Sequence, residues 1–118
     1  MKIKKSAREK RLWDLYRLTK SDFDKMMKFQ GGVCAISKIP PKNFRLNIDH
    51  CHKSGKIRGL LSMSMNRGLA YFNDNPKLLR AAADYLENPT APLALGRVVY
   101  GLLGKAIYKK KMVYGRER

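Results

Sequence analysis

The feature that most constrains the fold is a pair of short strand-like segments near the middle of the chain, separated by a turn. Residues 44–48 alternate apolar and polar side chains, as a strand with one buried face does. Residues 57–61 return to strand character, and the Ser54-Gly55 pair between the two segments is typical of a turn. A helical pattern then begins at Ser62 or shortly after it. The sequence therefore predicts an α+β core in which strand, turn, strand and helix follow one another.

Helical patterns flank this core on both sides. We expect a first helix from Ser6 to about Leu18, and a second that begins at Thr19 or Ser21 and ends at Gln30. Downstream, the Asn-Asp-Asn-Pro sequence at 73–76 ends one helix and opens another. The predicted organisation is a set of basic N-terminal helices (1–32), a central core (33–89) and a basic helical C-terminal extension (90–118).

Polar side chains gather where the predicted strands and helix meet. Asp49 and His50 follow the first strand, His52 lies in the turn, and Asn66 lies in the helix. Carboxylate and amide oxygens are hard ligands suited to Mg²⁺, which keeps several waters and is usually completed by substrate phosphate. We therefore predict one Mg²⁺ or Mn²⁺ ion between Asp49 and Asn66, with His50 taking a proton from water. The alternatives are a purely structural role for His50 and a helix-capping role for Asn66.

The expected substrate is a polyanion, because the charge of the chain is extreme. The 118 residues include 26 Lys and Arg against 9 Asp and Glu, which gives a formal net charge of +17. Such a surplus favours nucleic acid, since each neutralised phosphate releases condensed counterions, although an anionic membrane surface is a second possibility. The polar cluster and the charge together predict a metal-dependent nuclease that contacts the DNA backbone with its basic ends. Nothing in the sequence excludes RNA as a substrate.

The apolar segments and the cysteines favour an intracellular protein without a membrane anchor. The two cysteines do not form a disulfide framework, and the basic N-terminus lacks the apolar core of a signal peptide. Residues 93–107 carry apolar side chains at helical spacing, weakened by three glycines and broken by Arg97 and Lys105. This segment is expected to pack on the domain or on a second copy of the chain, with membrane binding as the minor alternative.

The run from Asp49 to Leu61, followed by Asn66 and Leu69, resembles the phage recombination endonuclease VII family. The similarity covers about residues 15–89. This family belongs to the His-Me finger nucleases, also described as HNH-like or ββα-metal nucleases. The resemblance therefore implies a ββα-metal core and an endonuclease that acts on branched or structured DNA, of the Holliday-junction-resolving type. A homing or nicking endonuclease on duplex DNA is an alternative, and so is a non-catalytic basic DNA-binding protein.

The resemblance also assigns roles to individual residues. By position, Asp49 and Asn66 would be the metal ligands and His50 the general base. His52 would contact or orient the scissile phosphate, and Arg58 would lie near the site, on the DNA backbone. Resolving a junction symmetrically requires two active sites, so a homodimer would favour that role and a monomer would favour nicking.

One departure from the family concerns its structural zinc. The family holds its hairpin with a zinc ion bound by four cysteines in two pairs, and the matching positions here are Cys34, Ser37, Ser62 and Met65. One thiolate cannot make a structural zinc site, because serine and methionine are poor zinc ligands. We therefore expect no structural zinc. The hairpin is instead expected to be held by apolar packing around Val33, Ile36, Leu61 and Met65.

Overall fold

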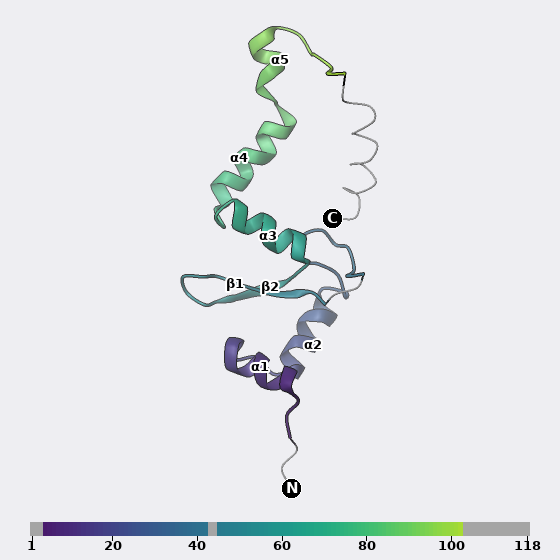
Figure 1. Cartoon of the computed structure of the whole chain (residues 1–118), viewed down its shortest axis with the longest axis vertical. Helices are drawn as coiled ribbons and strands as arrows, with labels where there is room; N and C mark the ends of the chain where they lie inside the picture. The colour runs from purple at the N-terminus through teal and green to yellow at the C-terminus, as the bar shows by residue number, and fades with distance from the viewer. Residues whose placement is uncertain (1–3, 43–44, 103–118) are drawn as a thin grey trace. The chain divides into compact units, whose positions relative to one another are not determined.

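The computed structural model describes residues 4–42 and 45–102 and shows an α+β protein (Figure 1). The chain divides into two compact units, residues 1–66 and residues 67–118, and the boundary falls inside helix α3, Met63–Tyr71. One antiparallel hairpin and five helices make up the described part, which confirms the predicted α+β class. The predicted three-part organisation stays a prediction.

Two capped helices open the first unit. In α1, Ala7–Tyr16, the Ser6 hydroxyl accepts a hydrogen bond from the Glu9 N–H at 3.1 Å, and the Glu9 carboxylate accepts one from the Ser6 N–H. In α2, Lys20–Phe29, Thr19 and Asp22 form the same reciprocal pair. Each such cap contributes about 1 kcal/mol to its helix. Both predicted helix starts are therefore confirmed, while α1 ends earlier than expected because the residue after it adopts a left-handed conformation.

The hairpin consists of β1, Asn47–His50, and β2, Ile57–Leu61. The second strand has the predicted bounds, whereas the first begins later in the chain than the alternating pattern at 44–48 indicated. The strands pair antiparallel, with Ile48 opposite Leu60 and Asp49 opposite Gly59. The register then shifts, because His50 faces Ile57 and residue 58 has no partner on β1. The hairpin therefore contains a β-bulge beside the predicted polar cluster.

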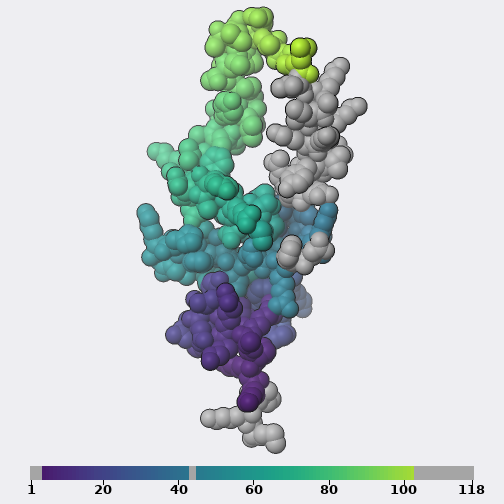
Figure 2. Space-filling model, viewed as in Figure 1, coloured from purple at the N-terminus to yellow at the C-terminus, as the bar shows by residue number. Residues whose placement is uncertain are grey.

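A small apolar core holds the first unit together. Its members are less than a tenth exposed and come from both helices, the loop after α2, the residue before β1, and β2: Leu12, Phe23, Cys34, Leu46, Leu60 and Leu61. Figure 2 shows the atoms of α1 and α2 gathered in one mass beside the hairpin. One expectation about this core is wrong, because Ile36 is 48% exposed. Phe29, the last residue of α2, is 94% exposed.

The loop after α2 is joined to β2 mainly by one side chain. The Gln30 amide donates to the carbonyl oxygens of Val33 at 2.8 Å and Leu60 at 3.0 Å, and its Oε1 accepts from the Leu60 N–H at 3.0 Å. The Ala35 N–H also donates to the Leu60 carbonyl, at 3.1 Å. Both backbone polar groups of a fully buried residue are thereby satisfied. Polar contacts, as well as apolar packing, therefore hold the hairpin.

The second unit is helical in its described part and contains no buried residue between 67 and 102. Helix α4, Pro76–Glu87, begins at Asn75, whose side chain accepts hydrogen bonds from two backbone N–H groups. Helix α5, Thr90–Leu95, ends because Gly96 adopts a left-handed conformation. The predicted continuation of a helix beyond Leu95 is therefore wrong as far as residue 102. The rest of that prediction falls outside the described residues, and no described helix is long and apolar enough to span a membrane.

Candidate active site

The β-bulge decides which side chain meets Asp49. Along a regular strand, successive side chains point to opposite faces of the sheet. Asp49 is opposite Gly59 and His50 is opposite Ile57, so Arg58 is the extra residue of the bulge. A bulge re-aims the side chain that it carries. In this hairpin it directs the guanidinium of Arg58 onto the carboxylate of Asp49.

Asp49 and Arg58 form a two-pronged ion pair. The Nε and Nη2 atoms of Arg58 donate to the two carboxylate oxygens of Asp49 at 2.7 and 2.9 Å. The side chain of Asp49 is 8% exposed, whereas that of Arg58 is 32% exposed. A buried carboxylate requires such a partner, since desolvating an unpaired charge costs several kcal/mol. Arg58 therefore contacts the predicted metal ligand itself, while its role on the DNA backbone stays a prediction.

His50 lies close to two other rings. Its ring centroid is 4.8 Å from that of His52 and 5.9 Å from that of Tyr16, both in tilted arrangements. His50 ends β1, His52 opens the turn, and Tyr16 is the last residue of α1. The structure thus brings the two predicted histidines together and adds Tyr16, which the sequence did not indicate. The aromatic contact on one side limits the orientations open to the His50 imidazole.

Asn66 lies in the first turn of α3, in the same unit as the hairpin. Its backbone N–H donates to the Ser62 carbonyl at 2.9 Å, so it belongs to the helix and does not cap it. Within the described part of the chain, no hydrogen bond joins its side chain to Asp49 or His50. The structure therefore confirms the position of Asn66 in the helix after β2, while its role as a metal ligand stays a prediction.

The oxygen atoms of the predicted metal ligands are of the kind that binds a hard divalent cation. Asp49 offers carboxylate oxygens and Asn66 an amide oxygen, which are ligands that Mg²⁺ accepts. Within residues 4–42 and 45–102, no three His, Cys, Asp or Glu side chains are placed to share an ion. A cation here would consequently depend on water and substrate phosphate for the rest of its coordination. It would also compete with Arg58, which holds both carboxylate oxygens.

Hydrogen bonds surround Cys34, the one cysteine at the four positions that match the family's zinc ligands. Cys34 is fully buried. Burial raises the pKa of its thiol, but hydrogen bonds from the Ser37 hydroxyl and from backbone N–H groups of Ser62, Ser37 and Ile36 outweigh it and lower the pKa to about 7. The Ser62 hydroxyl also accepts from the Met65 N–H at 3.3 Å. Hydrogen-bond donors thus gather around the single thiol, and the absence of structural zinc stays a prediction.

Cys51 begins the turn between the strands, directly after His50. The Ser54 hydroxyl, together with the backbone N–H groups of Ser54 and Lys53, lowers the pKa of the Cys51 thiol to about 7. The turn is closed by hydrogen bonds from the Cys51 N–H to the Lys56 carbonyl and from the Gly55 N–H to the Cys51 carbonyl, each 2.8 Å long. Gly55 adopts a φ of 78°, which a side chain would strain. The turn therefore fixes the backbone that carries His52.

The chain is similar to one protein family and to proteins of two mycobacteriophages. The chain matches the model of the family described as recombination endonuclease VII over residues 9–88. It is 35% identical over 99 residues to the gene 59 protein of Mycobacterium phage D29, covering 78% of this chain and 60% of that protein. It is 36% identical over 90 residues to the gene 59 protein of Mycobacterium phage L5, covering 75% of this chain and 55% of that protein.

The chain therefore spans little more than half of the length of either curated relative. No solved structure gives a significant match. The family match includes both strands of the hairpin, and with them the Asp49–Arg58 pair, the two histidines and Asn66. On this evidence, the chain belongs to the recombination endonuclease VII family.

Proposed function

We propose that this chain is a metal-dependent DNA endonuclease whose active site is the bulged end of the β1–β2 hairpin. The observation that carries the proposal is the grouping of His50 and His52, with ring centroids 4.8 Å apart, on the segment that also holds the buried Asp49–Arg58 pair. A base, a second imidazole, a carboxylate and a guanidinium on one short hairpin are the groups that phosphodiester hydrolysis uses. Membership of the family supports the same activity.

In the proposed reaction, His50 accepts a proton from a water molecule as that water attacks phosphorus. One P–O bond to the sugar then breaks, and the leaving oxygen takes a proton from solvent. His52 donates a hydrogen bond to a non-bridging oxygen of the scissile phosphate, which orients the phosphate for attack. Tyr16 limits the rotation of the His50 ring through its contact at 5.9 Å. These roles divide the work between a proton acceptor and a phosphate-orienting group.

Asp49 and Asn66 are the residues that would hold the Mg²⁺ or Mn²⁺ ion. When bound there, the ion supplies positive charge beside the phosphate oxygens and the leaving oxygen. Arg58 has a part in this arrangement, because a guanidinium binds carboxylate and phosphate in the same two-pronged way. We propose that Arg58 exchanges part of its contact with Asp49 for a phosphate of the DNA backbone when the site is loaded.

The proposed substrate is branched DNA, with a four-way junction as the type case. The family description, recombination endonuclease, supports this choice. Symmetrical cleavage of a junction requires two active sites, so the proposal includes a homodimer. The second unit supplies apolar side chains for such an association: Leu86, Leu93 and Tyr100 are 78%, 80% and 88% exposed. Sedimentation of the purified protein across a concentration series tests the dimer directly.

The decisive experiment incubates the protein with a labelled four-way junction and with a duplex of matched sequence, with and without Mg²⁺. We expect cleavage of the junction in Mg²⁺ and none after chelation. His50→Ala should retain its fold and its affinity for the junction while its cleavage rate falls by about 10²–10⁴-fold, the usual share of a general base. Near-normal cleavage by folded His50→Ala would remove the assignment of the base.

Two other results would change the proposal. Equal cleavage of duplex and junction, with single nicks, would indicate a nicking or homing endonuclease. Tight binding of both DNAs without cleavage in either metal would indicate a non-catalytic DNA-binding protein. An RNA copy of the duplex strand, included in the same series, decides whether the activity is limited to DNA.

A further inference from the structure

A hollowed surface of the first unit is lined by α1 and by the residues directly before and in β1. Three adjoining hollows of about 670, 180 and 490 Å³ share their lining residues. Arg8 and Arg45 line all three, and Arg11 lines two. Because neighbouring hollows have these walls in common, they form one groove, which we call the arginine groove. Phe23 and Leu46 contribute to its floor.

The charge of the arginine groove is strongly positive. Within the described residues, none of its three guanidinium groups forms an ion pair with a carboxylate. The guanidinium carbon of Arg8 lies 4.7 Å from the centroid of the Phe23 ring, a stacking contact that fixes the side chain without neutralising it. Asp14 is one acidic residue in the lining, and the other, Asp24, is paired with Lys20 at 3.0 Å. Three arginines without carboxylate partners beside one groove suit an anionic polymer.

The arginine groove leads to the candidate active site. Its middle part is lined by Tyr16 from α1 and by Asn47 and Ile48 from β1. The ring of Tyr16 also lies 5.9 Å, between centroids, from that of His50. Along a strand, the two residues from Ile48 to His50 span about 7 Å, which is about two base-pair steps along the axis of a DNA duplex. A strand with its scissile phosphate at His50 is therefore long enough to place its next phosphates in the groove after a few nucleotides.

We propose that the arginine groove binds the sugar–phosphate backbone of the DNA strand that runs on from the scissile phosphate, with Arg8, Arg11 and Arg45 each contacting a phosphate. This inference rests on the proposed function, because it takes His50 as the reaction centre. It extends that function by assigning a binding surface outside the hairpin and by giving the side of the site on which the strand continues. Such contacts position the substrate and carry little sequence preference.

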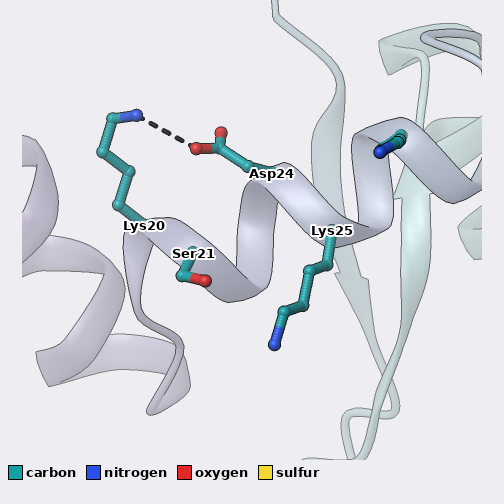
Figure 3. A pocket seen from close by; sticks show the side chains of 5 residues that line it. Lys20, Ser21, Asp24 and Lys25 are labelled. Carbon is teal, nitrogen blue, oxygen red and sulfur yellow. Dashed lines mark hydrogen bonds and ion pairs between the residues drawn. The ribbon is translucent and has the colours of Figure 1, made fainter.

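The test measures the affinity of a labelled DNA substrate across a salt series. The Arg8→Gln/Arg11→Gln/Arg45→Gln variant removes three charges from the groove. The matched control, Lys20→Gln/Lys25→Gln/Lys28→Gln, removes three charges from α2, around a hollow that has only Asp24 in common with the groove and is lined by none of its arginines (Figure 3). Each phosphate contact contributes about 0.9 to the slope of log affinity against log salt on duplex DNA. We expect the arginine variant to lower the slope by about two to three, and the lysine control to lower it by less than about one. Equal changes in the two variants would overturn the proposal.

A second measurement uses the unaltered protein, so the proposal remains testable even where the arginine variant unfolds. Single phosphates of the substrate are replaced by neutral methylphosphonates at successive positions on both sides of the cut. We expect affinity to fall about three- to tenfold for replacements within a few nucleotides on one side only. The folded arginine variant should be insensitive to the same replacements. Uniform effects on both sides would contradict the groove assignment.

The proposed function and the groove assignment fail in different ways. If the unaltered protein does not cleave any DNA in Mg²⁺ or Mn²⁺, the proposed function fails whatever the salt slopes are. If it cleaves DNA but its affinity does not depend on the arginines or on the phosphates to one side of the cut, only the inference about the groove fails.

The kinetics of cleavage give a further check. We expect the arginine variant to show a raised KM with a nearly unchanged kcat, since the groove contacts no reacting atom.

Discussion

Gln30 lies at the end of a helix, where most substitutions have small effects on stability. Replacing Gln30 by alanine should nevertheless destabilise the first unit strongly. The substitution removes three hydrogen bonds of 2.8–3.0 Å, two that join the end of α2 to Leu60 of β2 and one to the Val33 carbonyl in the loop after α2. At a net value of about 1 kcal/mol each, their loss costs about 3 kcal/mol. The Leu60 carbonyl keeps the Ala35 N–H at 3.1 Å, but the Leu60 N–H is left unpaired in a fully buried residue. A unit of this size has a total stability of only about 3–10 kcal/mol.

Urea unfolding, followed by the fluorescence of the single tryptophan, Trp13, measures this cost in the same unit. Lys20→Ala is a suitable control, because it truncates a long polar side chain on α2 whose ion pair with Asp24 is exposed, and it should cost less than about 1 kcal/mol. Gln30→Glu should be as harmful as Gln30→Ala at neutral pH, since a carboxylate cannot donate to the two carbonyl oxygens. Ordinary surface substitutions change stability by up to about 0.5 kcal/mol. The reasoning is refuted if the free energies of unfolding of Gln30→Ala and Lys20→Ala differ by no more than this amount.

Three further predictions concern metals and pH. Asn66→Ala should raise the Mg²⁺ concentration needed for half-maximal cleavage at least several-fold, since it removes an oxygen ligand; a metal titration that matches the unaltered protein would place the ion elsewhere. The purified protein should contain no stoichiometric zinc by elemental analysis and should keep its melting temperature in strong chelator, whereas one tightly bound zinc per chain and melting on chelation would reveal zinc ligands outside the four positions that match the family's cysteines. Because the pKa of Cys34 is lowered from 9.0 to about 7, the folded state favours the thiolate; this stabilisation is complete above pH 9 and is lost as the pH falls through 7. The stability of the unaltered protein relative to Cys34→Ser should therefore rise between pH 7 and 9, on the order of 2 kcal/mol, and parallel pH profiles of the two proteins would contradict it.

The parts of the fold that can be predicted are those whose cause is local. Ser6 and Thr19 begin their helices because each makes hydrogen bonds with a residue three positions later, a relation visible in the sequence. The strand at 57–61 has the same bounds in the sequence pattern and in the structure. The first strand begins only at Asn47, opposite Leu61, the last residue of β2, and this limit follows from the pairing of the two strands and not from the alternation of side chains. Phe29 fits the helical spacing of an apolar face but lies where that helix ends, so its exposure depends on the path of the loop after α2.

In the candidate site, too, the contacts with a local cause can be predicted from the sequence, and those that depend on tertiary packing cannot. Asp49, His50 and His52 are close neighbours in the sequence, so their proximity follows from the motif alone. Tyr16 joins His50 from another helix, and Gln30 joins Leu60 across 30 residues. No local pattern indicates such contacts, because they depend on how α1 and α2 pack around the core. The sequence places Arg58 near the site but does not indicate its pairing with Asp49, since that pairing depends on the bulge.

The way in which Gln30 contacts β2 also bears on self-association. The outer edge of a strand presents unpaired N–H and C=O groups, which can recruit a strand from another molecule. At Leu60 these groups are already taken by the amide of Gln30 and by the Ala35 N–H, so the loop after α2 occupies the place that a third strand would need. A two-stranded hairpin is marginal by itself and has two such edges. The amide that fixes the hairpin in place therefore also closes one of its edges against the strand-to-strand stacking that leads to aggregation.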